Sequence, residues 1–276
     1  MNSNLSGRLI ALGRLLFGIA LVAWGVQHLA AGDFVTRVVP SWPAWIPGRA
    51  MWAYLVGALL IAAGVAIVLD VKARIAAIAF GGLAFLSFVF LHVPLAARDM
   101  VLGGAWTSAG KALVMCGGAL CVAVSLTDGT RNPSSDGLSS ARVRQAIIIW
   151  GRLCLGAFMI LCGIQHFMFA GFVASLVPSW IPGAMFWTYF AGAALIAGGA
   201  GIIAPFVTWL AALLSGVMIF SWVFLVHVPL VMKDPHKAGD VAAVFEALAF
   251  SGVAFLLAGL VSRPRAATRP GFRTQH

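Results

Sequence analysis

Charge is scarce in this chain, and negative charge is the scarcest. Of its 276 residues, 9% are Asp, Glu, Lys or Arg and 62% are apolar, and the mean hydropathy is +1.00. So little polar surface cannot cover a water-soluble globule, which excludes a soluble fold. The chain is therefore predicted to be an integral membrane protein.

The sequence also lacks the alternation of apolar and polar residues that the strands of a membrane β-barrel would show. Its apolar residues form continuous stretches of about 20 residues, the length that an α-helix needs to cross a bilayer. We predict an all-α integral membrane protein with eight transmembrane helices, at residues 9–31, 50–69, 74–96, 106–126, 146–170, 184–203, 206–231 and 240–262.

Cysteine is rare as well, and no pair has the CxxC spacing of a redox or metal-binding motif. The four cysteines all lie within predicted helices, at Cys116, Cys121, Cys154 and Cys162. We interpret them as small buried apolar residues, so neither a disulfide nor a cysteine metal site is expected.

The formal net charge of +10 could suggest a nucleic-acid partner, but its distribution indicates membrane topology instead. With eight crossings, 12 of the 18 basic residues fall on the side that holds both termini, 5 fall on the other side, and Lys111 lies within a helix. An excess of Lys and Arg marks the cytoplasmic side. We therefore expect a multi-pass protein of the cytoplasmic (inner) membrane, with both termini cytoplasmic, the lipid bilayer as a partner and no nucleic acid.

The chain contains an internal duplication. Residues 13–42 and 151–180 align without a gap and share 13 identities in 30 positions. After a deletion of three residues in the second copy, positions that are 135 residues apart correspond. An even number of helices gives both copies the same orientation, so we predict two parallel-repeat four-helix bundles related by a pseudo-twofold axis along the membrane normal. The predicted regions are a first half at 1–126, a cytoplasmic linker at 127–144, a second half at 145–262 and a basic cytoplasmic tail at 263–276.

Each half carries the same kinds of polar residue near the predicted outer face. A Gln-His pair ends the first helix, a His-Val-Pro motif ends the third, a tyrosine begins the second, and the fourth has an ionisable residue one to two turns inside. Ionisable residues within membrane helices cost free energy and often mark a function. The candidates are Gln27, His28, Tyr54, His92 and Lys111 in the first half and Gln165, His166, Tyr189, His227 and Glu246 in the second.

Two interpretations of the histidines are open. The proline two residues after His92 or His227 ends or kinks its helix, and the imidazole could cap the carbonyls that this frees. Alternatively, His28 with His92, and His166 with His227, form two polar pockets that open outward.

Two further residue pairs also allow two interpretations each. Trp42 and Trp180, in the repeated Pro-Ser-Trp turns, either anchor the protein at the membrane interface or cover the polar pockets. Lys111 and Glu246 occupy equivalent positions with opposite charges. They either pair across the pseudo-twofold axis, or each faces the histidines of its own half.

The Gln-His end of helix one, the outer loop rich in proline and tryptophan, and the His-Pro motif after helix three together resemble the DoxX-like integral membrane proteins. Here the four-helix unit is duplicated in tandem and covers nearly the whole chain. The resemblance implies a small membrane partner of redox systems, associated in some branches with quinone-linked oxidation of sulfur compounds and in others with thiol or oxidant defence. It rests on Gln27, His28 and His92 and on their counterparts Gln165, His166 and His227.

Three functions follow from these residues. In the first, the histidines act as catalytic proton carriers in a quinone-linked oxidoreductase subunit, and the neighbouring amide, phenol, tryptophan and charged groups bind the quinone headgroup. A partner redox enzyme would supply electrons, because the sequence has no flavin or nucleotide motif. In the second, the protein is a small-molecule transporter with a site at the repeat interface; in the third, it is a non-catalytic scaffold for a redox enzyme. Histidines at one depth could also hold haem b, or a copper or zinc ion.

Overall fold

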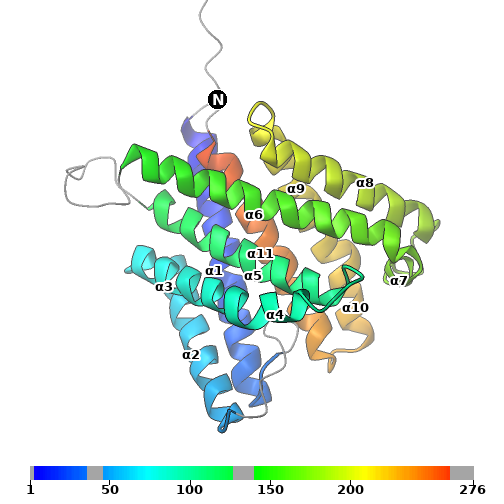
Figure 1. Ribbon diagram of the computed structural model, residues 1–276, viewed down its shortest axis with the longest axis horizontal. Helices are drawn as coiled ribbons and strands as arrows, with labels where there is room; N and C mark the ends of the chain where they lie inside the picture. The colour runs from blue at the N-terminus through cyan, green and yellow to red at the C-terminus, as the bar shows by residue number, and fades with distance from the viewer. Residues whose placement is uncertain (1–2, 36–45, 127–139, 262–276) are drawn as a thin grey trace, which may run out of the picture.

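The computed structural model describes residues 3–35, 46–126 and 140–261, and the regular structure within them is helical (Figure 1). Eight of these helices are long and apolar enough to cross a membrane, which confirms the predicted spans to within a few residues. Their length and composition indicate a multi-pass helical membrane protein. The elements are α1 (Ser3–Ala31), α2 (Arg49–Val68), α3 (Ala73–Ser87), η1 (Phe88–His92), α4 (Val93–Ala96), α5 (Gly104–Ser125), α6 (Ala141–Met168), α7 (Ala170–Ser175), α8 (Ala184–Ile203), α9 (Thr208–Trp222), η3 (Val223–His227), α10 (Val228–Lys233) and α11 (Ala238–Leu260).

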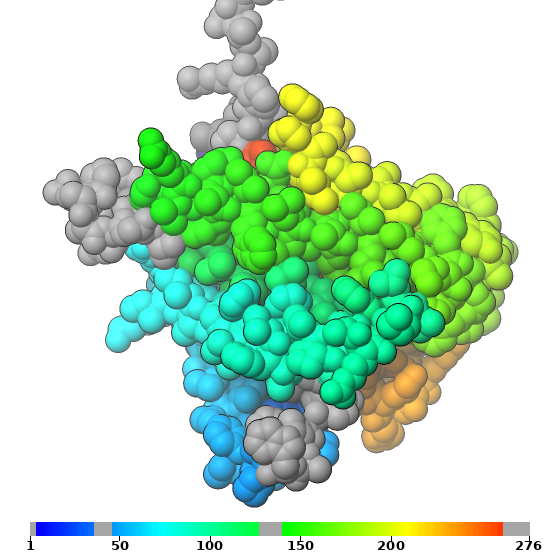
Figure 2. Space-filling view, in the orientation of Figure 1, coloured from blue at the N-terminus to red at the C-terminus, as the bar shows by residue number. Residues whose placement is uncertain are grey.

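The long helices form two groups, and each group takes helices from both halves. In the first group α1 packs along α2 and α11, and α11 packs along α9. In the second group α6 packs along α8 and α5, and α5 packs along α3. In Figure 1, α1 and α2 run steeply down the view while α6 and α8 run across it. In Figure 2, α6 and the segment from α3 to α5 cover the near face.

This arrangement changes one expectation. We predicted that each half would form its own four-helix bundle, but the first helix of each half instead packs against the fourth helix of the other half. The halves are thus interlocked, and the contacts between them are part of the fold. The two fourth helices, α5 and α11, also touch each other.

Burial identifies α5 and α11 as the centre of the molecule. The most apolar 18-residue windows of α11 and α5 are 78% and 61% buried, whereas those of α2, α8 and the span containing α3 are between 22% and 28% buried. Residues on the outer helices face the lipid, where apolar side chains need no cover. The central helices therefore place any residue that they carry in the interior of the protein.

Glycine permits the closest helix contacts, and the same contact occurs in each half. A Cβ atom on Gly25 of α1 would lie 2.5 Å from the carbonyl oxygen of Gly57 in α2. At the equivalent positions, a Cβ atom on Gly163 of α6 would lie 2.7 Å from the carbonyl oxygen of Gly192 in α8. Backbones that approach this closely leave no room for any larger residue.

The two His-Val-Pro motifs lie in π-helical turns rather than at helix ends. The N–H of Val93 bonds the carbonyl of Phe88, and the N–H of Val228 bonds that of Val223, both five residues back. The proline that follows has no N–H and would clash with a carbonyl four residues earlier in an α-helix, and the wider turn relieves that clash. Each helix continues past its proline as α4 or α10, so of the two expected effects, ending or kinking the helix, the proline does not end it.

Replacing Gly25 with alanine should destabilise the protein by about 1–3 kcal/mol, because the new methyl group would collide with the backbone of α2. Denaturant unfolding of the purified protein in detergent measures this. Gly82→Ala in α3 is the matched control, since a Cβ atom there meets nothing within 4 Å. Equal stability of the two variants would contradict the close α1–α2 contact.

Candidate functional site

An ion pair joins the two central helices. The ammonium nitrogen of Lys111 on α5 lies 3.0 and 2.9 Å from the two carboxylate oxygens of Glu246 on α11. The side chains are 17% and 7% exposed, so the pair lies in the interior. This confirms the prediction that these equivalent positions pair across the two halves.

Two further polar groups lie within electrostatic range of this ion pair. His92, at the end of η1, is within range of Lys111. Cys162 of α6 is within range of both Lys111 and Glu246. Lys111 thus pairs with Glu246 while His92 of its own half lies within electrostatic range.

The histidines of the two Gln-His pairs, His28 and His166, each make the same kind of hydrogen bond. The Nδ1 atom of His28 is 2.7 Å from the carbonyl oxygen of Trp24, and that of His166 is 2.7 Å from the carbonyl oxygen of Cys162. Because a carbonyl only accepts, each Nδ1 carries a proton and donates. In a neutral imidazole the other nitrogen, Nε2, then has a free lone pair and accepts.

The histidines of the first half are more deeply buried than those of the second. His28 is 0% exposed and His92 is 3% exposed, whereas His166 and His227 are partly exposed. Within the described residues, the Nε2 atoms of His28 and His92 are buried and have no hydrogen-bond partner. Buried polar atoms without partners are rare, and each one calls for an explanation such as a bound molecule.

The amide nitrogens of the two glutamines bind backbone, whereas the buried Oε1 of Gln27 has no partner among the described residues. The amide nitrogen of Gln165 donates to the carbonyls of Leu102 and Gly103, at 2.6 and 3.1 Å, at the start of α5. The amide nitrogen of Gln27 donates to the carbonyl of Ala238 at the start of α11, at 3.4 Å. Gly103 and Ala238 are equivalent positions, so each first helix holds the beginning of the other half's fourth helix.

The aromatic candidates lie at the surface. Tyr54 is 48% exposed and Tyr189 is 43% exposed, and the ring of Tyr189 stacks on Phe167 with centroids 5.5 Å apart. Trp180 is 62% exposed. Trp42 lies outside the described residues. The structure thus does not bury the described aromatic candidates beside the histidines.

One kind of contact, at the other ends of the first helices, was not recognised in the sequence. The guanidinium of Arg152 donates to the carbonyls of Ile202 and Ile203 at the end of α8, at 3.0 and 2.7 Å. The equivalent Arg14 pairs with Asp70 after α2, at 2.9 Å. The signal for these contacts in the sequence was an arginine at the equivalent position of both halves.

A second unrecognised contact lies beside His28. The guanidinium Nε of Arg49, at the start of α2, donates to a carboxylate oxygen of Asp33, which also accepts the N–H of Phe34. The hydrogen bond from Arg49, together with that from Phe34, holds the pKa of Asp33 below its ordinary value, so this carboxylate is ionised at neutral pH. The sequence feature that indicates this contact is the acidic residue itself, because the chain has only 8 Asp and Glu residues.

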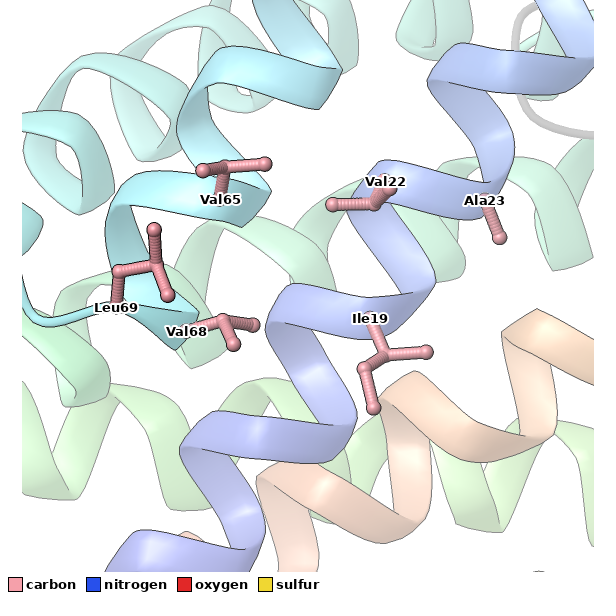
Figure 3. Close-up of a pocket in the computed structure, with 6 residues that line it drawn as sticks. All are labelled: Ile19, Val22, Ala23, Val65, Val68 and Leu69. Carbon is pink, nitrogen blue, oxygen red and sulfur yellow. The ribbon is translucent and has the colours of Figure 1, made fainter.

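Two apolar grooves lie away from the histidines. One, of about 390 Å³, runs between α1 and α2 (Figure 3) and is lined by Ile19, Val22, Ala23, Val65, Val68 and Leu69. Another, of about 360 Å³, lies between α8 and α9. Their walls suit lipid chains, and Ser215 is the one polar side chain among the residues that line them. Across the described ranges, no three His, Cys, Asp or Glu side chains are arranged to hold a metal ion.

Comparison with known proteins finds one family model that matches part of the chain. A family described as Domain of unknown function (DUF8561) matches residues 155–251, which lie in the second half. Neither the curated proteins nor the solved structures give a match. The resemblance to DoxX-like proteins gains no support from these comparisons and stays a prediction.

Neutralising one member of the central ion pair should destabilise the protein by about 3–5 kcal/mol, because a buried charge is left alone. We expect this for Lys111→Gln and for Glu246→Gln in detergent unfolding. The exchanged pair, Lys111→Glu with Glu246→Lys, should recover most of the loss. Additive losses in the exchanged protein would contradict direct pairing.

A peripheral ion pair with an exposed lysine provides the control for these variants. Lys237 and Asp240 lie 3.0 Å apart near the start of α11, and their side chains are 62% and 17% exposed. Lys237→Gln should cost less than about 1 kcal/mol, because the remaining Asp240 lies in the first turn of α11, where the helix dipole favours a negative charge.

Proposed function

We propose that this protein is an inner-membrane partner of a redox enzyme and that it binds the headgroup of a quinol-type molecule at His28 and His92. The observation that supports this is the pair of buried Nε2 atoms without hydrogen-bond partners. Leaving a polar atom buried and unpaired costs about 1–3 kcal/mol. A bound headgroup that supplies the missing hydrogen bonds would remove that cost.

The hydrogen bond of His28 favours the reduced form of such a molecule. Its Nδ1 donates to Trp24, so its neutral Nε2 accepts. A hydroquinone offers hydroxyl donors to that nitrogen, whereas a quinone carbonyl offers none. When bound, the molecule would supply two-electron redox chemistry, and the partner enzyme would exchange the electrons.

The residues of the chain would orient the headgroup and hold its proton. His28 can receive a proton at Nε2 while its Nδ1 keeps the ring aligned on Trp24. His92 is the second buried imidazole, and it lies within electrostatic range of Lys111, which belongs to the central ion pair. The glutamine amides already bind backbone, so we assign them to holding the helices around the site.

The same proposal includes the repeat symmetry. We infer a pseudo-twofold axis that relates the halves and passes near the Lys111–Glu246 pair. The reciprocal bonds of Gln27 and Gln165 to equivalent backbone positions support it. With the distribution of basic residues, this supports cytoplasmic termini and a site that faces outward. Membership of the DoxX-like proteins is part of this proposal.

A transporter with a site at the repeat interface is the second candidate. Its support is the interruption of the third helix in each half by a π-helical turn and proline, since matched interruptions are common around transporter binding sites. The ion pair between α5 and α11 would then be the contact that breaks as the halves move. Uptake of hydroquinone into sealed proteoliposomes, rather than binding alone, would favour this candidate.

The binding proposal is tested with the purified protein in lipid nanodiscs and a short-chain hydroquinone, by isothermal titration calorimetry. We expect the hydroquinone to bind about tenfold more tightly than the matched quinone, the effect of one good hydrogen bond. His28→Phe should lower the affinity by about tenfold or more.

His166→Phe is the matched control, because it removes the equivalent imidazole of the second half and leaves the buried pair intact. It should retain most of the affinity. Stronger binding of the quinone than of the hydroquinone, or an equal loss in both variants, would contradict the proposal.

A further inference from the structure

The end of α1 folds back over His28. Gly32 adopts a left-handed conformation, with φ of 60°, and turns the chain after the helix. The next three residues, Asp33 to Val35, then run beside the histidine. Phe34 and Val35 are 5% and 4% exposed, and the ring of Phe34 stands nearly perpendicular to that of His28, with centroids 5.8 Å apart. Phe34 is thus part of the cover that leaves His28 fully buried.

An ion pair holds this cover to the next helix. Asp33 accepts hydrogen bonds from the backbone N–H of Phe34 and from the side chain of Arg49. Arg49 is the first residue of α2, where the helix dipole disfavours a positive charge. A cation at this position is therefore not explained by the helix itself, whereas the pairing with Asp33 explains it.

The second half provides an internal comparison, because it lacks both members of the pair. Gly171 stands where the first half has Asp33, and Ala184 stands where it has Arg49. The phenylalanine is retained as Phe172, but it lies on α7 and is 67% exposed. His166, the counterpart of His28, is partly exposed. The left-handed Gly32 is also replaced, by Ala170, so the ion pair, the turn and the cover are lost together.

We propose that Asp33 and Arg49 form a latch that holds Phe34 over His28. The site at His28 is then closed, and opening of the latch controls access to this histidine. The equivalent His166 of the second half has no such latch and stays accessible. Asp33, Phe34 and Arg49 are positioning residues in this scheme. The latch regulates the quinol site of the proposed function, but the cover itself can be tested without any ligand.

The Arg49–Asp33 ion pair is weak enough for the cover over His28 to open. The side chains of Arg49 and Asp33 are 49% and 45% exposed, and ion pairs this exposed contribute little to stability. Removing the pair should therefore leave the fold intact and shift only the balance between covered and uncovered His28. A shift of about two- to fivefold corresponds to a typical exposed pair.

The test measures the rate at which diethyl pyrocarbonate modifies each imidazole of the full-length protein in nanodiscs, by peptide mass spectrometry. In the wild type, His166 should react faster than His28. Arg49→Ala and Asp33→Gly, which copy the second half, should each raise the His28 rate about two- to fivefold. Phe34→Ala should raise it more, since it removes the cover itself. The exchanged pair Asp33→Arg with Arg49→Asp should return the rate toward that of the wild type.

The His166 rate is the internal control and should stay constant in every variant. A wild-type His28 that reacts as fast as His166, or a His28 rate unchanged by both Arg49→Ala and Phe34→Ala, would overturn the latch. Faster modification without any hydroquinone binding would leave the latch standing and refute only the ligand. The two proposals can therefore fail separately.

Discussion

The interior of a bilayer holds no water, so every polar group within the membrane must find its partner in the protein. This constraint explains how the two halves are joined. Gln27 and Gln165 each donate to the first turn of the other half's fourth helix, and Lys111 pairs with Glu246 between those two helices. The polar residues thus act as specific links between apolar surfaces that would otherwise pack without selectivity.

Against this background, the unpaired Nε2 atoms of His28 and His92 are conspicuous. The Nδ1 of His28 has a short hydrogen bond to the carbonyl of Trp24. Other buried side-chain atoms without a partner among the described residues include the Oε1 of Gln27, next to His28 in the sequence, and the Nε of Arg14. The unpaired atoms of Gln27 and His28 together mark the end of α1 as a place where a ligand would complete the hydrogen bonding, whereas these buried atoms include no nitrogen of His166 or His227.

Much of the architecture could be predicted from the sequence, because apolar length fixes the spans and the duplication fixes their correspondence. The pairing of Lys111 with Glu246 followed from opposite charges at equivalent positions. The exchange of helices between halves could not be predicted, and the reason is physical. A Cβ atom on Gly13 of α1 would meet Gly252 of α11, and Gly117 of α5 occupies the position equivalent to Gly252. The fourth helices of the two halves therefore offer the first helix the same glycine at the contact. The sequence does not show whether α1 packs against the fourth helix of its own half or of the other half.

The candidate site was predictable only in part. The repeated spacing identified the histidines as candidates. Residue type did not indicate that the glutamine amides would bind backbone or that both tyrosines would lie at the protein surface. The cover over His28 was equally hidden, because Phe34 and Phe172 are identical residues with opposite exposure. The charges at Asp33 and Arg49 and the turn at Gly32, all absent from the second half, are the differences in sequence that correspond to the two environments.

The central claim is that the Nε2 of His28 is unprotonated and accepts a hydrogen bond from a hydroxyl group of the ligand. Nitrogen-15 NMR of histidine-labelled protein in nanodiscs tests this claim most directly. The spectrum of His28→Phe identifies the His28 signals. The account predicts a proton on Nδ1, an unprotonated Nε2, and a change of the Nε2 chemical shift when hydroquinone is added. A proton already on Nε2 in the neutral ring, or an Nε2 shift unchanged at saturating hydroquinone, would contradict it.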